Sequence, residues 1–330
     1  QIIGGASKLY TYQPSFNLHL LSKTVLNIYT KQNMSRVQLQ LQYTASTTAK
    51  ALDKNAHEHK AWTEPAVDFK SGMFRPVVEE ADGLTCEIIQ GELPLDMPSG
   101  TYFRNGPNPF HPPGDNDPYH YFDGDGMIAS FNISNNSNNK ENKRTVLFSH
   151  KWIKTERLIH DKIKQKSVYE FGGMATGTLM FGSDVSNENG NRMGKANTSL
   201  IFHHNKLLAL EEADMPYRIH PKTLDTLGLT YHFGKNMNRT SSDSNNEPTI
   251  FTAHPKIDYT TRELIGYGCG YDPTKQILNY YVINPDGNIT TNFPITLRHT
   301  SYMHDFAITT NYSICFDGNL ILNWKLAVKI

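Results

Sequence analysis

Two histidines stand where side chains could hold a metal ion. His254 lies in the run Phe251-Thr-Ala-His-Pro-Lys, and His304 lies in Ser301-Tyr-Met-His-Asp-Phe-Ala-Ile. Pro255 favours extended geometry in the residue before it, so His254 is expected at a strand end. A histidine at a strand end can point its ring into a central cavity while the backbone stays in the sheet. By type and context alone, each is more often a hydrogen-bonded structural histidine than a ligand, so both interpretations stay open.

Other polar runs match known sites less well. Gly190-Asn-Arg-Met-Gly-Lys-Ala is one residue shorter than a phosphate-binding loop and ends on alanine where a hydroxyl should bind Mg²⁺. Gly266-Tyr-Gly-Cys-Gly alternates as a strand does and lacks the dinucleotide-binding pattern. The adjacent His203 and His204 would point to opposite faces of a strand, so a hairpin turn is the preferred interpretation. Four aspartates lack the order of a calcium loop and are interpreted as turn formers: Asp115, Asp117, Asp123 and Asp125.

The composition excludes several classes of function. The 32 basic side chains balance 32 acidic ones, which leaves no electrostatic argument for binding nucleic acid or an anionic membrane. Cys86, Cys269 and Cys315 are widely spaced and suit neither a disulfide framework nor a CxxC metal site. No apolar stretch approaches the roughly 20 residues that a spanning helix needs. We therefore expect a soluble, cytoplasmic protein with reduced thiols, and peripheral membrane contact stays open.

The elements that must position the two histidines are short strands. Runs such as Ile277-Leu-Asn-Tyr-Tyr-Val-Ile recur from about Pro65 onwards and are separated by turn dipeptides such as Asp286-Gly. Few windows keep a helical period. This spacing favours a sandwich, a barrel or a propeller, and the lack of a tight repeat is compatible with a β-propeller of divergent blades. The Asn/Ser-rich stretches 134–143 and 236–247 are interpreted as surface insertions.

Longer motifs follow one another in order between about Phe69 and Asp317. They are Gly100-Thr-Tyr-Phe-Arg-Asn-Gly-Pro-Asn-Pro, Tyr119-His-Tyr-Phe-Asp-Gly-Asp-Gly-Met-Ile, Glu170-Phe-Gly-Gly-Met, Ala196-Asn-Thr, Leu207-Leu-Ala-Leu-Glu-Glu-Ala-Asp-Met-Pro-Tyr, Thr223-Leu-Asp-Thr-Leu-Gly, Ala253-His-Pro-Lys and Met303-His-Asp-Phe-Ala-Ile-Thr. In this order they resemble the carotenoid cleavage dioxygenase (carotenoid oxygenase) family.

The resemblance implies an all-β fold, a seven-bladed β-propeller with Fe²⁺ on its axis held by four histidines. It makes His254 the first iron ligand and His304 the second. Four neutral imidazoles suit ferrous iron and leave positions open for O₂. In such sites a carboxylate accepts the second ring N–H of a ligand, and Glu212 matches that position behind His304. Glu211 points to the other face of its strand and is the less suited of the two. No catalytic residue beyond the iron site is expected.

The sequence departs from the family pattern at both ends. Only 26 residues follow His304, so the third and fourth ligands are expected outside this chain and the propeller is expected to be incomplete. Residues 318–330 are expected to be a non-family tail of translated intron. Residues 1–64 are expected to be a poorly structured leader, in part untranslated upstream of Met34. The partial propeller is expected over 65–317, with exposed sheet edges prone to association.

For the intact protein, the resemblance implies a non-haem Fe²⁺ dioxygenase that cleaves a conjugated C=C bond of a carotenoid or apocarotenoid with O₂. The products are two carbonyl compounds, and the partners are an apolar polyene and O₂ rather than nucleic acid. The identity of the polyene, the bond and the oligomeric state are not specified. Alternatives are stilbene cleavage, retinoid isomerisation, or a truncated member that binds an apolar ligand or partner without catalysis. With two of four ligands, this chain is expected to be inactive by itself.

Overall fold

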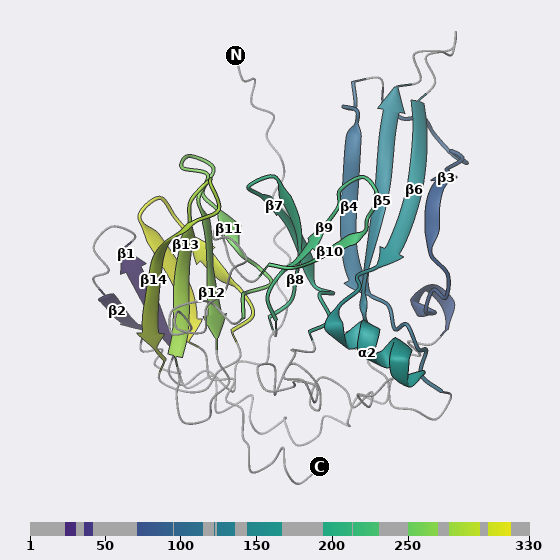
Figure 1. Cartoon of the computed structure of the whole chain (residues 1–330). Coiled ribbons are helices and arrows are strands. Elements are labelled where there is room, and N and C mark those ends of the chain that lie inside the picture. The colour runs from purple at the N-terminus through teal and green to yellow at the C-terminus, as the bar shows by residue number, and fades with distance from the viewer. Residues whose placement is uncertain are drawn as a thin grey trace, which may run out of the picture.

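Regular structure in the computed structural model is almost entirely β (Figure 1). The described residues are 24–30, 36–41, 71–94, 96–114, 122, 124–135, 144–166, 194–212, 214–230, 250–269, 277–297 and 303–317, with the backbone alone in the first two segments. The expected start at Met34, the expected tail 318–330 and the motif at Glu170 lie outside them.

The strands pair antiparallel into four sheets of four strands each. The first sheet has the order β3-β6-β5-β4, the second β10-β9-β8-β7, the third β11-β12-β13-β14 and the fourth β15-β16-β1-β2. The strands are β1 (Thr24–Thr30), β2 (Arg36–Leu41), β3 (Ala81–Thr85), β4 (Gly100–Pro107), β5 (Gly126–Asn135), β6 (Arg144–Trp152), β7 (Ser199–His203), β8 (Lys206–Leu210), β9 (Tyr217–Ile219), β10 (Thr226–Leu229), β11 (Lys256–Ile257), β12 (Leu264–Cys269), β13 (Ile277–Ile283), β14 (Ile289–Thr296), β15 (Phe306–Ile308) and β16 (Tyr312–Asp317).

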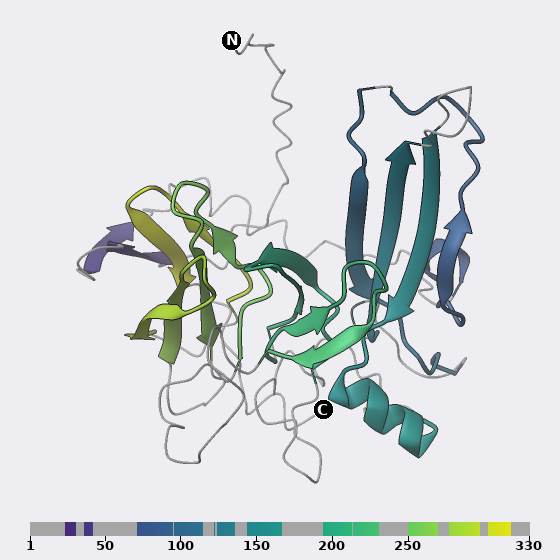
Figure 2. The same ribbon diagram turned by 45° about the horizontal axis from the view of Figure 1, so that its top comes forward.

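The four sheets lie side by side in this order, as both views show (Figures 1 and 2). Strand β8 shows why the second sheet packs on two sides. Leu207 and Ala209 point into a core shared with Ile128 of the first sheet. Leu208 and Leu210 point the other way, into a core shared with the third sheet. Successive side chains alternate across a strand, so a continuous apolar run such as this one buries both faces.

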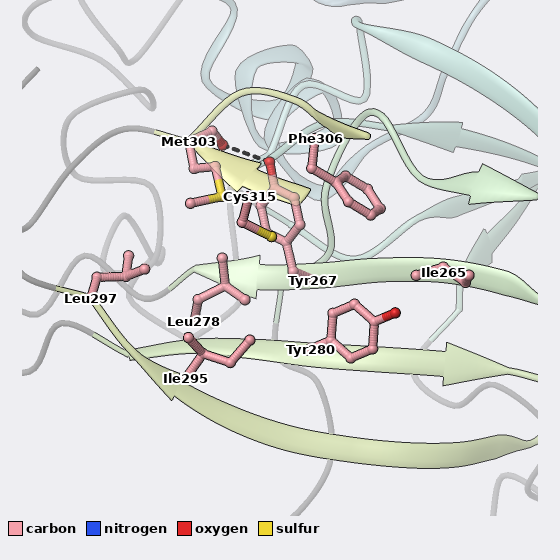
Figure 3. Close-up of a cluster of buried hydrophobic side chains, with 9 residues drawn as sticks. All are labelled: Ile265, Tyr267, Leu278, Tyr280, Ile295, Leu297, Met303, Phe306 and Cys315. Carbon is pink, nitrogen blue, oxygen red and sulfur yellow. Dashed lines mark hydrogen bonds between the residues drawn. The ribbon is translucent and has the colours of Figure 1, made fainter. Parts of the chain in front are cut away.

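The third sheet also buries both of its faces. Leu264 of β12 packs with Phe251 in the core shared with the second sheet. The next residue, Ile265, and then Tyr267 point into the core shared with the fourth sheet, where they meet Phe306 (Figure 3). Strand β12 therefore lies between the two segments that precede β11 and β15, and these segments carry the histidines.

One hairpin predicted from sequence is confirmed. His204 and Asn205 connect β7 to β8, and both have positive φ, 46° and 54°. Two positive φ values are typical of the two-residue turns that match strand twist. The ring of His203, by contrast, is buried and its Nε2 lies 3.2 Å from the carbonyl oxygen of Arg262. His203 thus ends strand β7, and His204 belongs to the turn of the hairpin.

A short helix, α2 (Glu156–Lys164), follows the last strand of the first sheet (Figure 1). Thr155 caps its N-terminus, because its side chain accepts a hydrogen bond from the Leu158 N–H. Gln165 ends it in the left-handed region, with φ 56°. No helix in the described part of the chain is long and apolar enough to cross a membrane.

The all-β fold expected from sequence is confirmed. Strands β1 and β2 both lie within residues 1–64, where a poorly structured leader was expected. Strand β1 pairs with β16, in a register that runs from Val25 opposite Asp317 to Thr30 opposite Tyr312. A local pattern cannot reveal a partner strand so distant in sequence. The limits of the propeller at 65 and 317 stay a prediction.

Candidate metal centre

Three polar side chains that are distant in sequence meet at the ends of three consecutive sheets. Glu212 lies two residues after β8 of the second sheet ends. His254 lies two residues before β11 of the third sheet begins, and His304 two residues before β15 of the fourth. The strand-end positions predicted for the two histidines are confirmed by these bounds. Because each side chain comes from a different sheet, the packing of the sheets sets their distances.

The two imidazole rings face each other through the same ring nitrogen. His254 Nε2 lies 3.0 Å from His304 Nε2, and the ring centroids are 4.4 Å apart with planes at 73°. On the other side of its ring, His304 Nδ1 contacts Glu212 Oε1 directly. One ligand atom from each of the three residues lies within 4.8 Å of the others. The predicted pairing of Glu212 with His304 is thus present in the structure.

The environment of the site sets opposite charge tendencies on the two rings. The hydrogen bond to Glu212 raises the pKa of His304, although partial burial opposes it. Burial lowers the pKa of His254, and the nearby His304 lowers it further. The side chain of Glu212 is only 8% exposed, whereas that of His304 is 52% exposed. A buried carboxylate therefore contacts one ring, and the lowered pKa of the second ring favours its neutral form, in which it can donate a lone pair.

The donor set fits a divalent transition metal. With a proton on Nδ1 directed at Glu212, His304 would present Nε2, the nitrogen that faces His254, as a metal-binding atom. Two ligand nitrogens at right angles around an ion, with bonds of about 2.1 Å, lie about 3 Å apart. The observed Nε2 separation of 3.0 Å therefore suits two cis ligands. In the described part of the chain, this is the one group of three or more His, Cys, Asp or Glu side chains that could hold a metal ion.

The neighbouring Glu211 has a different role. It is buried, and its Oε2 accepts hydrogen bonds from the backbone N–H groups of Lys195 and Ala196. Burial raises the pKa of its carboxyl, and the charge of Lys195 opposes that rise. Its side chain ties the segment before β7 to the residue after β8. Glu211 was expected on the other face of a strand, but β8 ends at Leu210, so Glu211 lies just beyond the strand.

Contacts between and within the two histidine segments were not predicted from the sequence. Thr252 Oγ1 accepts a hydrogen bond of 3.1 Å from the His254 N–H. Lys256 Nζ lies 2.7 Å from Asp305 Oδ1, so an ion pair joins the residue after Pro255 to the residue after His304. No local spacing signals that pair, because its two members are 49 positions apart. Their closeness to the histidines in the two motifs was the only available signal.

Comparison with known proteins supports the order of motifs found in the sequence. The family model described as "Retinal pigment epithelial membrane protein" matches residues 74–329. This match continues beyond Asp317. It therefore does not support the family boundary expected at that residue, which stays a prediction. The carotenoid 9,10(9',10')-cleavage dioxygenase of Crocus sativus is 37% identical over 282 residues, covering 79% of this chain and 46% of that protein.

Two further relatives extend the comparison. The isoeugenol monooxygenase of Pseudomonas nitroreducens is 32% identical over 245 residues, covering 74% of this chain and 45% of that protein. The solved structure of the lignostilbene dioxygenase of Pseudomonas brassicacearum superposes with a TM-score of 0.58 at 28% identity, over 76% of this chain and 46% of that one. The chain thus spans about half the length of the curated relatives it matches. The expected β-propeller fold, incomplete in this chain, is confirmed by this superposition.

Proposed function

Because the chain belongs to the retinal pigment epithelial membrane protein family, the carotenoid oxygenases, we propose that it contributes part of a non-haem Fe²⁺ site for oxidative C=C cleavage. In this proposal His254 and His304 are iron ligands, and Glu212 orients His304. The remaining two histidines that the family resemblance implies would come from sequence outside the described residues. The reaction is an oxygenase reaction on a double bond, and its substrate class is an apolar conjugated compound.

The observation that carries the proposal is the convergence of His254 Nε2 and His304 Nε2 at 3.0 Å, with Glu212 against the far nitrogen of His304. A hydrogen-bonded structural histidine needs one partner on a nearby element. Here three consecutive sheets each supply one member of a compact group, and the carboxylate is buried. This is the arrangement expected of a metal ligand held by an outer carboxylate.

The chemistry balances with O₂ as the only co-substrate. The conjugated C=C bond breaks, each of its two carbons takes one oxygen atom, and two carbonyl groups form. Ferrous iron, when bound, supplies the electrons with which dioxygen is activated. In this chain the two imidazoles would bind the ion, and Glu212 would keep a proton on His304 Nδ1.

The metal part of the proposal can be tested in the chain as it stands. Anaerobic titration with Fe²⁺ should show one bound ion, and His254→Ala and His304→Ala should each abolish that binding. His203→Ala is the matched control, because His203 is a buried histidine outside the group and contacts Arg262. Binding that survives loss of both His254 and His304 would count against the site.

The reaction part requires substrates of more than one class. The iron-loaded protein would be incubated under ¹⁸O₂ with an apocarotenal, a stilbene and isoeugenol, and aldehydes would be identified by chromatography and mass spectrometry. An aldehyde that carries ¹⁸O supports the oxygenase proposal and names the substrate class. No aldehyde from the chain despite bound iron favours the non-catalytic alternative, in which the chain binds an apolar ligand or partner.

The partners and the cellular location of the protein are also part of the proposal. The partners are an apolar polyene and O₂, and the location is cytoplasmic, with peripheral contact to a membrane that supplies the polyene. Sedimentation with phosphatidylcholine vesicles tests that contact directly. Protein that stays in the supernatant at every lipid concentration contradicts it.

A further inference from the structure

The alternating run Gly266-Tyr267-Gly268 has no part in the site described so far. It lies in β12, between the segment that carries His254 and the segment that carries His304. The two glycines share one face of the strand, and Tyr267 lies on the other. Each face makes close contact with one histidine segment.

On the glycine face, the segment before His254 lies directly against the strand. A Cβ atom at Gly266 would come within 2.4 Å of the ring of Phe251, and one at Gly268 within 2.4 Å of the carbonyl oxygen of Ile250. The close approach lets the Thr252 N–H donate a hydrogen bond of 2.7 Å to the carbonyl oxygen of Tyr267. Side chains at the two glycine positions would push this segment away from β12.

On the other face, the Tyr267 side chain reaches the segment of His304. Its hydroxyl donates a hydrogen bond of 2.8 Å to the carbonyl oxygen of Met303, the residue directly before His304 (Figure 3). Its ring meets Phe306 edge-on, with centroids 5.4 Å apart. Tyr267 is 1% exposed and Met303 is 3% exposed, so water cannot easily replace this hydrogen bond.

We propose that Tyr267 is a positioning residue of the metal centre: its backbone carbonyl fixes the segment of His254, and its hydroxyl fixes the segment of His304. One rigid residue thus sets both histidine segments from the strand between them. The inference rests on the proposed metal centre and deepens it, because ligands must be held within about half an ångström of their working geometry. Without the hydroxyl, the buried Met303 carbonyl loses its partner and the His304 segment shifts to find another.

The test compares two tyrosine-to-phenylalanine variants from the same core. Tyr267→Phe removes the hydroxyl that holds Met303. Tyr280→Phe is the matched control, because Tyr280 is buried in the same cluster as Tyr267. The Tyr280 hydroxyl is 2.7 Å from Ser313 Oγ, and Ser313 lies in β16 and not in a segment that carries a histidine. Both variants lose one buried hydrogen bond, so both should lower the thermal midpoint by a similar amount.

Two readouts separate positioning from simple destabilisation. Co²⁺, titrated by its visible absorption, should bind Tyr267→Phe about tenfold more weakly than the unsubstituted chain, and Tyr280→Phe with unchanged affinity. Hydrogen exchange without metal should show lost protection in residues 303–306 for Tyr267→Phe alone. Equal Co²⁺ affinity and equal exchange in the two variants would overturn the inference.

A second variant acts on the opposite face and keeps the test decisive if Tyr267→Phe fails to fold. Gly268→Ala should displace the Ile250 carbonyl and weaken Co²⁺ binding, whereas Gly100→Ala, in β4, meets no atom within 4 Å and should bind Co²⁺ normally. If the unsubstituted chain binds no Co²⁺, the proposed metal centre fails. The exchange measurement then still decides whether Tyr267 holds the two segments.

Discussion

Glu211 and Glu212 are neighbours in sequence, yet their side chains contact different parts of the protein. Glu212 contacts His304, and Glu211 accepts backbone hydrogen bonds from Lys195 and Ala196. Both lie just after β8, which ends at Leu210, so the different contacts come from the path of the chain beyond the strand. At the scale of single residues, the site therefore depends on which of two identical side chains faces the metal position.

Replacing each glutamate in turn should separate the two roles. Glu212→Gln keeps the size of the side chain but removes the charge that holds the Nδ1 proton of His304. We expect Fe²⁺ affinity to fall about 10–100-fold, the usual effect of losing an outer partner of a ligand, as measured by anaerobic titration. Glu211→Gln should lower the unfolding midpoint and leave Fe²⁺ affinity unchanged. Equal losses of affinity in both variants would contradict the assignment.

His203 should make the stability of the fold depend on pH. Burial lowers its pKa, although the hydrogen bond to the Arg262 carbonyl opposes the shift. Below about pH 6.5 the unfolded chain takes up a proton at this position while the folded chain resists it, so stability falls as the pH drops. His203→Gln keeps a donor for Arg262 without that proton. The urea midpoint should therefore fall less between pH 7.5 and 5.5 in the variant than in the unsubstituted chain. Parallel decreases would contradict the prediction.

At the scale of elements, the shortest strands depend on the longer strands with which they pair. Strand β11 has just two residues, Lys256 and Ile257, yet it aligns the segment that carries His254. Strand β15 has three residues and does the same for His304. Neither would persist alone, because a strand gains stability from its cross-strand pairs. The histidine positions thus depend on β12 and β16, the longer strands with which these two pair.

Helix α2 is the element whose local signals can be tested one by one. The Thr155 hydroxyl accepts the Leu158 N–H and is fully buried. Thr155→Ala should cost about 0.5–2 kcal/mol of unfolding free energy, measured by urea denaturation, because the helix N-terminus loses its cap. Thr155→Ser keeps the hydroxyl and should recover most of the loss. A serine variant as unstable as the alanine variant would show that the lost methyl group, and not the cap, matters.

At the scale of the whole molecule, the first and the fourth sheets, which lie at the two ends of the series of four, have apolar side chains on their outer faces. Tyr102, Phe131, Phe148 and Leu84 form one row across all four strands of the first sheet. Tyr102 is 60% exposed and Leu84 is 56% exposed. On the fourth sheet, Phe316 is 49% exposed. In a propeller each sheet packs face to face with two others, so faces of this kind are built to be covered.

The exposed row of the first sheet should cause association of the chain as it stands. Replacing both Leu84 and Tyr102 with lysine should raise the monomer fraction in size-exclusion chromatography with light scattering, because charge opposes burial of that face. Lysine in place of Thr85 and Asn132, two exposed polar residues of the same sheet, is the control, since this pair adds the same two positive charges without removing apolar surface. An unchanged monomer fraction in the Leu84 and Tyr102 variant would exclude this face as the main contact.

The sequence by itself determined the class of the fold and the identity of the side chains at the candidate site. Strand period and turn dipeptides are local properties, so the all-β prediction and the His204-Asn205 hairpin needed no structure. The order of motifs identified His254, His304 and Glu212 as candidates, although spacing alone left both histidines undecided. The pairing of β1 with β16 had no signal in the sequence, because the two strands are almost 300 positions apart.

Only the tertiary structure decided the geometry between elements. The 3.0 Å approach of the two Nε2 atoms, the Lys256–Asp305 pair and the two hydrogen bonds of Tyr267 all join segments that are distant in sequence. Their distances follow from how the fourth sheet and the segment before β11 pack on the two faces of β12, and no local pattern encodes that packing. The physical reason is that a chain specifies its short-range preferences residue by residue, whereas ligand geometry is set by the core as a whole.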